Sequence, residues 1–428
     1  MAGSAPERTR SGVRRVAVLD GFRAYAILGV VVIHLLGMSG ALAATGGSTF
    51  SVVTWGVLGN VIDFFFIISG FVLFLPMVLR EGRPGSLRRY ALGRAARLVP
   101  AYWLSLAVVL ALIVLVPPPP AFATPGLASV GLHLGALQMP ARLLDGSFAI
   151  GFGVNGPVWM LSVIVGFYAV LPLIARPYFH HPLAGLAIAA MIAIGWKEAV
   201  LHLDGLFEAL AGPGQPPLLV RLIATDQLPG WAFSFALGMT GAWAYVRHQC
   251  RGAAGLARRW TWAAAASLAA YCAFAYLIGR HATTISEPFV AGYARGEPLI
   301  SVGSSASRAV LMATVALGPA WLQRPFANRP ARRLGELSYS LYLIHVALGI
   351  YAASLLGLPT NGTVGDVALW FAVVVPASLA YAWVAVRLVE RPVRRWAAKH
   401  DARAREQSQP PITTDAPRLA SGAARGTP

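Results

Sequence analysis

Charged side chains are scarce in this sequence, and acidic ones are the scarcest. Only 12% of the 428 residues are charged, against roughly 25% in ordinary soluble proteins, while 57% are hydrophobic. So little charge cannot cover the water-exposed surface of a soluble chain of this length. The composition therefore excludes an ordinary soluble protein and predicts an all-α polytopic membrane protein, a bundle of transmembrane helices.

Cysteine is nearly absent, and the basic residues are not distributed as in a nucleic-acid-binding domain. Cys250 and Cys272 are too few for a disulfide framework or a cysteine-based metal site, and we expect neither a disulfide nor a metal. The net charge of +18 is large. A nucleic-acid-binding domain, however, would gather its basic residues with aromatic ones on a soluble surface. Here the arginines form short clusters between long apolar runs, so we predict no nucleic-acid partner.

Apolar runs long enough to cross a bilayer, about 20 residues each, recur ten times. They lie near residues 17–38, 55–79, 98–116, 157–176, 182–200, 228–247, 260–279, 307–323, 337–357 and 367–389. Arginine clusters occupy alternate connections, such as 80–97 and 324–333, whereas 39–54 and 358–366 hold no basic residue. This positive-inside pattern predicts ten transmembrane helices in the plasma membrane, with both termini in the cytoplasm.

Three regions follow from this pattern. Residues 1–16 form a basic cytoplasmic N-terminus, and 17–395 form the transmembrane domain, whose first span is too long for a cleaved signal peptide. Residues 396–428 are polar, without an apolar period, and we expect a disordered cytoplasmic tail. The Pro- and Gly-rich segment 117–155 is expected to be an outer loop with a re-entrant piece near 127–139.

Ionisable residues within a span cost several kcal/mol, so each one is a functional hypothesis. His34, His345 and Asp63 are the clearest cases. Arg23 and His34 share one face of the first span, about 16 Å apart along its axis. Imidazole suits a general base because its pKa lies near about 6.5, although a buried histidine bonded to a backbone carbonyl is the alternative. We predict His34 as the base, with Arg23 and Asp63 setting its environment.

Further polar groups recur at helical spacing. Arg94 and Arg97 share a face at the start of the third span, where they would either grip phosphates or anchor the helix at the interface. Both interpretations remain open. Ser338, Tyr342 and His345 follow an i, i+4, i+7 spacing and form a polar stripe that we expect to point into the bundle.

Two shorter segments have structural interpretations as well. Ser69-Gly70 in the second span favours a close approach of two helices. Residues 390–392, Glu-Arg-Pro, fit a helix-terminal ion pair followed by a proline stop.

Five motifs in order resemble those of the acyltransferase 3 family of integral membrane O-acyltransferases. They are R-x10-H from Arg23 to His34, D-x-F-F-x-x-S-G-F at 63–71, R-x-x-R-x-x-P at 94–100, L-G-x-x-S-Y-x-L-Y-L-x-H at 334–345 and E-R-P at 390–392. The resemblance covers about residues 18–395. One segment departs from it: where the family reads W-S-L-x-x-E-x-x-F-Y, residues 159–168 carry Met160 for the serine and Ile164 for the glutamate. This departure predicts either lower activity or a different acceptor.

The resemblance implies a membrane-bound O-acyltransferase that moves an acyl group, commonly acetyl, from cytoplasmic acyl-CoA to a hydroxyl. The acceptor would be a carbohydrate, a glycolipid, or a macrolide-type or other small glycoside, and the family uses no metal. Three sets of site residues follow: His34, Arg23 and Asp63 for catalysis; Arg94 and Arg97 for the CoA phosphates; and Trp159, Tyr168, Tyr342 and His345 for the substrate. Two alternatives remain, a transporter or flippase for a polar solute or acyl group, and a catalytically silent scaffold.

Overall fold

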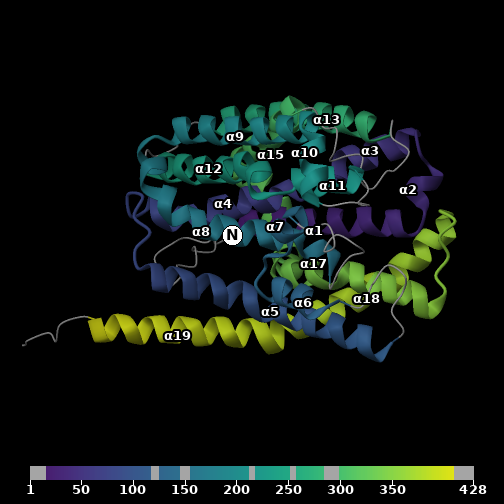
Figure 1. Cartoon of the computed structure of the whole chain (residues 1–428). Coiled ribbons are helices and arrows are strands. Elements are labelled where there is room, and N and C mark those ends of the chain that lie inside the picture. The colour runs from purple at the N-terminus through teal and green to yellow at the C-terminus, as the bar shows by residue number, and fades with distance from the viewer. Residues whose placement is uncertain are drawn as a thin grey trace, which may run out of the picture.

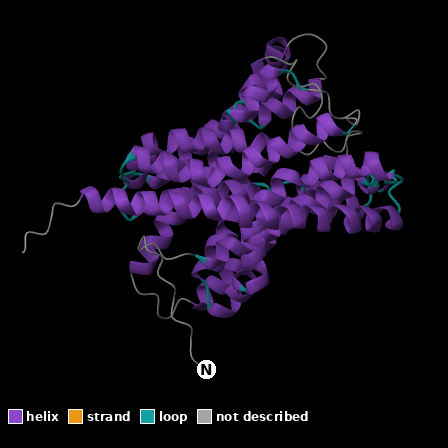
Figure 2. Ribbon diagram, turned by 90° about the horizontal axis from the view of Figure 1, so that it is seen from below, coloured by secondary structure: helices purple, strands orange, loops and turns teal. Residues whose placement is uncertain are grey.

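The structure, a computed structural model, describes residues 16–116, 125–144, 155–211, 217–250, 257–283 and 298–408. Every regular element in these ranges is helical (Figure 2). The long helices are α1 (Ala17–Met38), α4 (Asp63–Val78), α5 (Leu87–Leu115), α8 (Trp159–His180), α9 (Pro182–His202), α12 (Ala232–Cys250), α13 (Ala257–Thr283), α15 (Pro298–Leu317), α17 (Arg329–Leu356), α18 (Val364–Ala385) and α19 (Arg391–Ser408). The all-α prediction is confirmed.

Shorter helical elements connect the long ones. They are α2 (Ala41–Ala44), α3 (Thr49–Leu58), α6 (Leu127–Leu134), α7 (Gln138–Leu144), the 3-10 turns η2 (Gly156–Val158) and η3 (Leu228–Trp231), α10 (Asp204–Ala211), α11 (Pro217–Thr225), α16 (Ala320–Ala327) and the π-helical turn η4 (Val386–Glu390). The piece that we expected to re-enter the membrane forms α6 and α7. The rest of the predicted outer loop, residues 117–124 and 145–154, lies outside the described residues.

Nine helical stretches within the described residues are long and apolar enough to cross a membrane. The predicted span near 228–247 is present as α12, but it does not meet these limits of length and composition. Its sequence includes Ser234 and Thr240 and ends in Arg247 and His248. Its packing compensates, because α12 lies against α4, α9 and α15 rather than standing alone. The chain is thus a polytopic membrane protein. Within the described residues, nine of the ten predicted spans are apolar enough to cross a membrane on their own.

The long helices lie side by side, with α1, α4 and α17 in the middle of the bundle (Figure 1). Helix α4 packs on α12, and α1 packs on α17. A Cβ added at Gly70 would collide with the carbonyl oxygen of Phe235, and one at Gly238 with that of Ile67. The backbones of α4 and α12 therefore nearly touch, which confirms the close helix approach predicted for Ser69-Gly70.

Two boundaries differ from the sequence prediction. Helix α15 begins at Pro298, nine residues before the predicted span at 307–323. The prediction started too late because the first turns of this helix are rich in serine and lack a long apolar run. The tail prediction is wrong for residues 396–408, which continue α19 as a helix along α5 (Figure 1). After Pro392 this segment contains neither glycine nor proline and is rich in Ala and Arg, which favour a helix. Residues 1–15 and 409–428 lie outside the described residues.

Candidate active site

A cavity of about 1140 Å³ lies at one end of the bundle. It is bounded by α1, α4, α5, α8, α17 and α19 together with the connection between α4 and α5. Its lining includes Val16, residues 84–86, Glu336 and Arg391, which belong to segments that the arginine pattern predicts to be cytoplasmic. The described cavity therefore faces the side on which the sequence predicts the termini.

The cavity carries an excess of positive charge. Seven arginines line it, against three carboxylates: Arg23, Arg80, Arg89, Arg94, Arg97, Arg391 and Arg394, with Asp20, Glu336 and Glu390. A concave surface with this charge balance concentrates anions. The remaining lining is largely apolar, so the cavity combines a basic rim with a hydrophobic interior.

Helix α5 provides the basic wall that the sequence predicted. It begins after Ser86, whose hydroxyl caps it by accepting a hydrogen bond from the Arg89 backbone N–H at 3.4 Å. The Arg94 guanidinium lies 5.9 Å from the ring centroid of Tyr90 and 6.0 Å from that of Tyr168. These cation–π contacts hold the side chain in place. Arg97, one turn further along α5, lines the same cavity.

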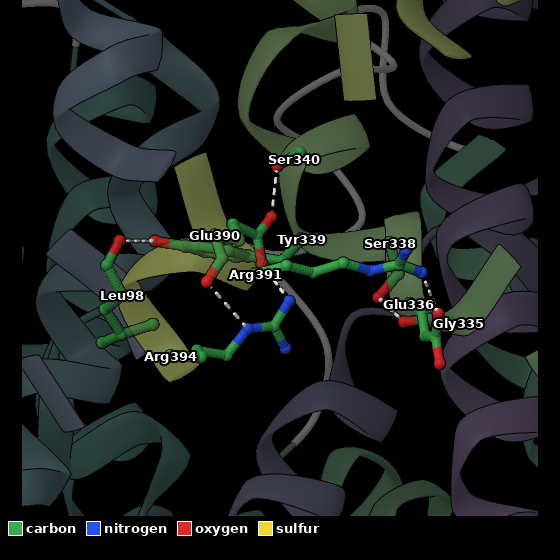
Figure 3. A network of polar contacts seen from close by, with 9 residues as sticks. All are labelled: Leu98, Gly335, Glu336, Ser338, Tyr339, Ser340, Glu390, Arg391 and Arg394. Carbon is green, nitrogen blue, oxygen red and sulfur yellow. Dashed lines mark hydrogen bonds and ion pairs between the residues drawn. The ribbon is translucent and has the colours of Figure 1, made fainter. Parts of the chain in front are cut away.

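A network of ion pairs on α17, η4 and α19 lies next to α5, to which Tyr339 of α17 donates a hydrogen bond at the Leu98 carbonyl oxygen, 3.0 Å away (Figure 3). Glu390 accepts a hydrogen bond from the Ser340 hydroxyl at 2.6 Å and pairs with Arg394 at 2.9 Å. Arg391 pairs instead with Glu336, at 3.0 Å. The predicted ion pairing at 390–392 is thus present with different partners, but the predicted proline stop is wrong. Pro392 lies in the first turn of α19, where a helix needs no backbone N–H from it.

Two histidines from distant parts of the chain meet beside the cavity. His345 Nε2 on α17 lies 3.3 Å from His34 Nδ1 on α1. His34 Nδ1 also lies 2.7 Å from the carbonyl oxygen of Val30, and His345 Nδ1 lies 3.0 Å from that of Leu341. Because a carbonyl oxygen only accepts, these contacts assign the proton to Nδ1 of each neutral ring. The basic lone pair of His34 is then on Nε2, and the lone pair of His345 faces the N–H of His34.

Neither histidine of this pair lines the described cavity, but Tyr342 lies next to both the cavity and His345. Tyr342 lines the cavity, its ring centroid lies 6.2 Å from that of His345, and its hydroxyl donates to the carbonyl oxygen of Pro157. His345 is fully buried. Of the predicted substrate residues, Tyr342 and Tyr168 line the cavity, whereas His345 contacts His34. Trp159 packs in a tilted arrangement on Trp231, with ring centroids 5.8 Å apart, and is not among the residues that line the cavity.

Arg23 lies where α1 meets the cavity, with its guanidinium 3.4 Å from the carboxylate of Asp20. It occupies the face of α1 that also carries His34, as its spacing predicted. Met160 and Ile164, the two departures from the family motif, also line the cavity. The two residues that differ from the family motif therefore lie in the candidate active site.

Asp63 has a partner that the sequence analysis missed. Its carboxylate pairs at 3.3 Å with Arg308 of α15, and both side chains are at most 2% exposed. Arg308 also donates to the Ser304 hydroxyl at 2.7 Å and lies 5.1 Å from the ring centroid of Tyr271. Asp63 is thus engaged by Arg308, while the described neighbour of the His34 imidazole is His345. The sequence analysis missed Arg308 because it started this span at residue 307, which put the arginine at the helix end. With α15 starting at Pro298, Arg308 lies in the middle of the helix and would have counted as an ionisable residue within a span.

Two further ionisable groups, the half-buried Lys197 and the buried Asp226, lie near this pair. The Lys197 ammonium on α9 donates to the Ser301 hydroxyl at 2.5 Å and interacts electrostatically with Asp63 and Asp226. Asp226 is buried between α11 and η3. Within the described ranges, no group of three His, Cys, Asp or Glu side chains is placed to hold a metal ion.

Asp226 should make stability depend on pH. Burial raises the pKa of its carboxyl from 3.8 to about 8, against the opposing effects of Lys197 and a hydrogen bond with Trp231. Between these values the folded state keeps a proton that the unfolded chain has lost, so this group's contribution to stability falls as pH rises through that window. We expect the thermal unfolding midpoint in detergent to fall between about pH 5 and 8 more steeply for the wild type than for Asp226→Asn. Parallel curves would exclude this titration.

Comparison with known proteins agrees with the motifs. The family model described as an acyltransferase domain, Acyl_transf_3, matches residues 16–387. The chain therefore belongs to the acyltransferase 3 family, and it is a multi-pass membrane protein. The resemblance drawn from the five motifs is confirmed.

Two curated relatives are peptidoglycan O-acetyltransferases by name. The peptidoglycan O-acetyltransferase OatA of Listeria monocytogenes is 22% identical over 400 residues, which cover 90% of this chain and 57% of that protein. The putative peptidoglycan O-acetyltransferase YrhL of Bacillus subtilis is 25% identical over 388 residues, covering 89% of this chain and 55% of that protein. The chain thus spans about half the length of these relatives. No solved structure matches the chain significantly.

Proposed function

We propose that this protein is a membrane-bound O-acetyltransferase that moves an acetyl group from acetyl-CoA to a hydroxyl of a carbohydrate acceptor. The acceptor class includes glycans such as peptidoglycan, glycolipids and small glycosides. The observation that carries the proposal is the arginine-rich cavity, whose lining residue Tyr342 has its ring centroid 6.2 Å from that of His345 in the His34–His345 pair.

The donor assignment rests on charge and topology. CoA carries its negative charges at the nucleotide end, and Arg94 and Arg97 offer guanidinia that match phosphate geometry. The apolar cavity interior, including Phe65, Met160 and Ile164, suits the uncharged arm that ends in the thioester. With the cavity on the cytoplasmic side, as the arginine pattern predicts, the donor enters from the compartment that holds it.

The chemistry follows from the tautomers. Nε2 of His34 takes the proton of the acceptor hydroxyl as the oxygen attacks the thioester carbonyl. The carbon–sulfur bond then breaks, and the imidazolium returns the proton to the CoA thiolate. The lone pair of His345 Nε2, 3.3 Å from His34 Nδ1, stabilises the imidazolium between these steps. His345 is therefore a positioning residue, and Arg23 contributes positive charge on the same helix face.

The proposal is tested by following the acetyl group. Membranes that carry the protein are incubated with acetyl-CoA labelled in the acetyl group and with a glycan and lipid extract, and free CoA and labelled extract are counted. We expect both to exceed those of empty membranes. Purified protein is assayed in parallel for acetyl-CoA binding. A folded protein that neither releases CoA nor binds acetyl-CoA would overturn the proposal and favour a transporter.

Removing the α5 arginines should weaken donor binding. Arg94→Gln and Arg97→Gln each delete charge-assisted hydrogen bonds, worth about 1.5–3 kcal/mol each, so we expect the KM for acetyl-CoA to rise about 10- to 100-fold. Arg88→Gln is the matched control, because Arg88 is exposed on the same helix and does not line the cavity. An equal rise in KM for all three variants would indicate a loss of general surface charge instead of specific contacts.

A further inference from the structure

The rim arginines of the cavity differ in how their charge is balanced. On α19, Arg391 and Arg394 each pair with a carboxylate, Glu336 and Glu390 respectively. Arg97 on α5 has no carboxylate partner among the described residues and interacts electrostatically with Arg394. Two guanidinium groups from different helices thus repel each other across one side of the cavity. Such a pair is stabilised by an anion that binds between them.

Arg394 is held so firmly that its position is set before any ligand arrives. Its Nη2 lies 2.9 Å from a carboxylate oxygen of Glu390, and its Nε donates to the Glu390 backbone oxygen at 3.3 Å. The other carboxylate oxygen of Glu390 accepts from Ser340 on α17 at 2.6 Å (Figure 3). Glu390 is 3% exposed, so its position depends on the core. Despite these contacts, the Arg394 side chain remains 42% exposed and lines the cavity.

The π-helical turn η4 explains why Glu390 occupies this position. The turn spans Val386–Glu390, between α18 and α19, and π turns inside helices occur frequently at functional sites. The wider turn carries Glu390 inward to Ser340 and leaves Arg394, one helical turn later, at the rim. A simple helix end would not require two side-chain contacts to one buried carboxylate. This arrangement therefore indicates a placed guanidinium, beyond the ordinary ion pair that the sequence suggested.

The position of Arg394 indicates which phosphate it would meet. Arg94 is held between two tyrosine rings and its Nε is buried, so it lies deeper than Arg394. In CoA the diphosphate adjoins the arm that leads to the thioester, while the phosphomonoester is on the ribose, further from the reacting group. A phosphomonoester carries nearly two negative charges at neutral pH, which suits two guanidinium groups. The doubly charged phosphomonoester therefore suits the pair of Arg97 and the exposed Arg394, and Arg94 is left for the diphosphate.

We propose that Arg97 and Arg394 form a subsite for the 3′-phosphomonoester of the donor, with Glu390 and Ser340 as positioning residues, so that the protein discriminates acetyl-CoA from acetyl-3′-dephospho-CoA. This inference rests on the proposed function, because it deepens the assignment of the donor. The shared chemistry, a phosphate between two arginines, could also be met by a lipid headgroup. A lipid phosphate, however, would not make the protein sensitive to the donor's own 3′-phosphate.

The test compares the two donors on detergent-solubilised full-length protein, in initial rates and in equilibrium binding of CoA and 3′-dephospho-CoA. For the wild type we expect KM and Kd to be about tenfold or more higher without the 3′-phosphate, at similar kcat. Arg394→Gln should raise the values for acetyl-CoA to those of the dephospho donor and leave the latter unchanged. Glu390→Gln should reduce the discrimination partly, because Arg394 remains but is no longer held by a charged partner.

Arg395→Gln is the matched control, since Arg395 is the exposed neighbour on α19 and does not line the cavity. It should retain the full discrimination. Equal affinity of the wild type for both donors, or an equal loss for both donors in Arg394→Gln, would overturn the subsite while leaving acyl transfer intact. Absence of both CoA binding and acetyl-CoA turnover would instead overturn the proposed function. Discrimination that is present in detergent but lost in vesicles of anionic lipid would show that headgroups occupy the arginine pair, and would also overturn the subsite.

Discussion

Replacing His34 by alanine should lower kcat for acetyl transfer by about 10²- to 10⁴-fold, the usual contribution of a general base. The KM for acetyl-CoA should stay within about twofold, because the arginines that line the cavity are untouched. His345→Ala should cost less, since Nε2 of His34 remains and only the stabilisation of its imidazolium is lost. The measurement is the initial rate of labelled acetyl transfer by equal amounts of folded protein.

His133 provides a control with the same local geometry. Its Nδ1 lies 2.8 Å from the carbonyl oxygen of Ser129, four residues earlier, just as His34 is bonded to Val30. His133 is buried on α6, and no residue of α6 lines the cavity, whereas α1 contributes Arg23 to the lining and places His34 against His345. His133→Ala should therefore affect stability and leave kcat unchanged. If His133→Ala and His34→Ala lower kcat equally, His34 is a structural histidine bonded to its own helix and another group must be the base.

The sequence predicted the helices most accurately where an apolar run has clear ends. The run at 17–38 coincides with α1, because polar residues and glycines follow Met38 directly. The start of α15 at Pro298 could not be located, since its first turns carry serines that face other helices and resemble a loop. The extension of α19 past residue 396 was missed for the opposite reason. Its polar composition resembles a disordered tail, although its helix propensity is high.

The site could be predicted one helix at a time, but not across helices. Motif spacing identified Arg94, Arg97 and Tyr342, and all three line the cavity. Spacing along one helix does not reveal which neighbour its face meets. His34 and His345 are 311 residues apart in the sequence, and only the packing of α1 on α17 brings them together. For the same reason the sequence did not identify Arg308 as the partner of Asp63.

The ion pair of Asp63 and Arg308 predicts the second large effect, on stability. Both charges are almost fully buried, and each would cost several kcal/mol without the other. Arg308→Met leaves the Asp63 carboxylate without its 3.3 Å partner, so we expect the free energy of unfolding to fall by about 3–5 kcal/mol. The double variant Asp63→Asn/Arg308→Met keeps neither buried charge. Its free energy of unfolding should therefore return most of the way to that of the wild type. The measurement is thermal unfolding of the four proteins in one detergent.

The exposed pair of Arg391 and Glu336 is the control for this cycle. Its side chains are 51% and 38% exposed, so removing either partner should change stability by at most about 1 kcal/mol. If the losses in Asp63→Asn and Arg308→Met simply add in the double variant, the two charges do not stabilise each other. Activity of the double variant decides the remaining question about Asp63. Retained acetyl transfer would make Asp63 a residue that joins α4 to α15, whereas its loss in a stable double variant would return Asp63 to the proton chemistry of His34.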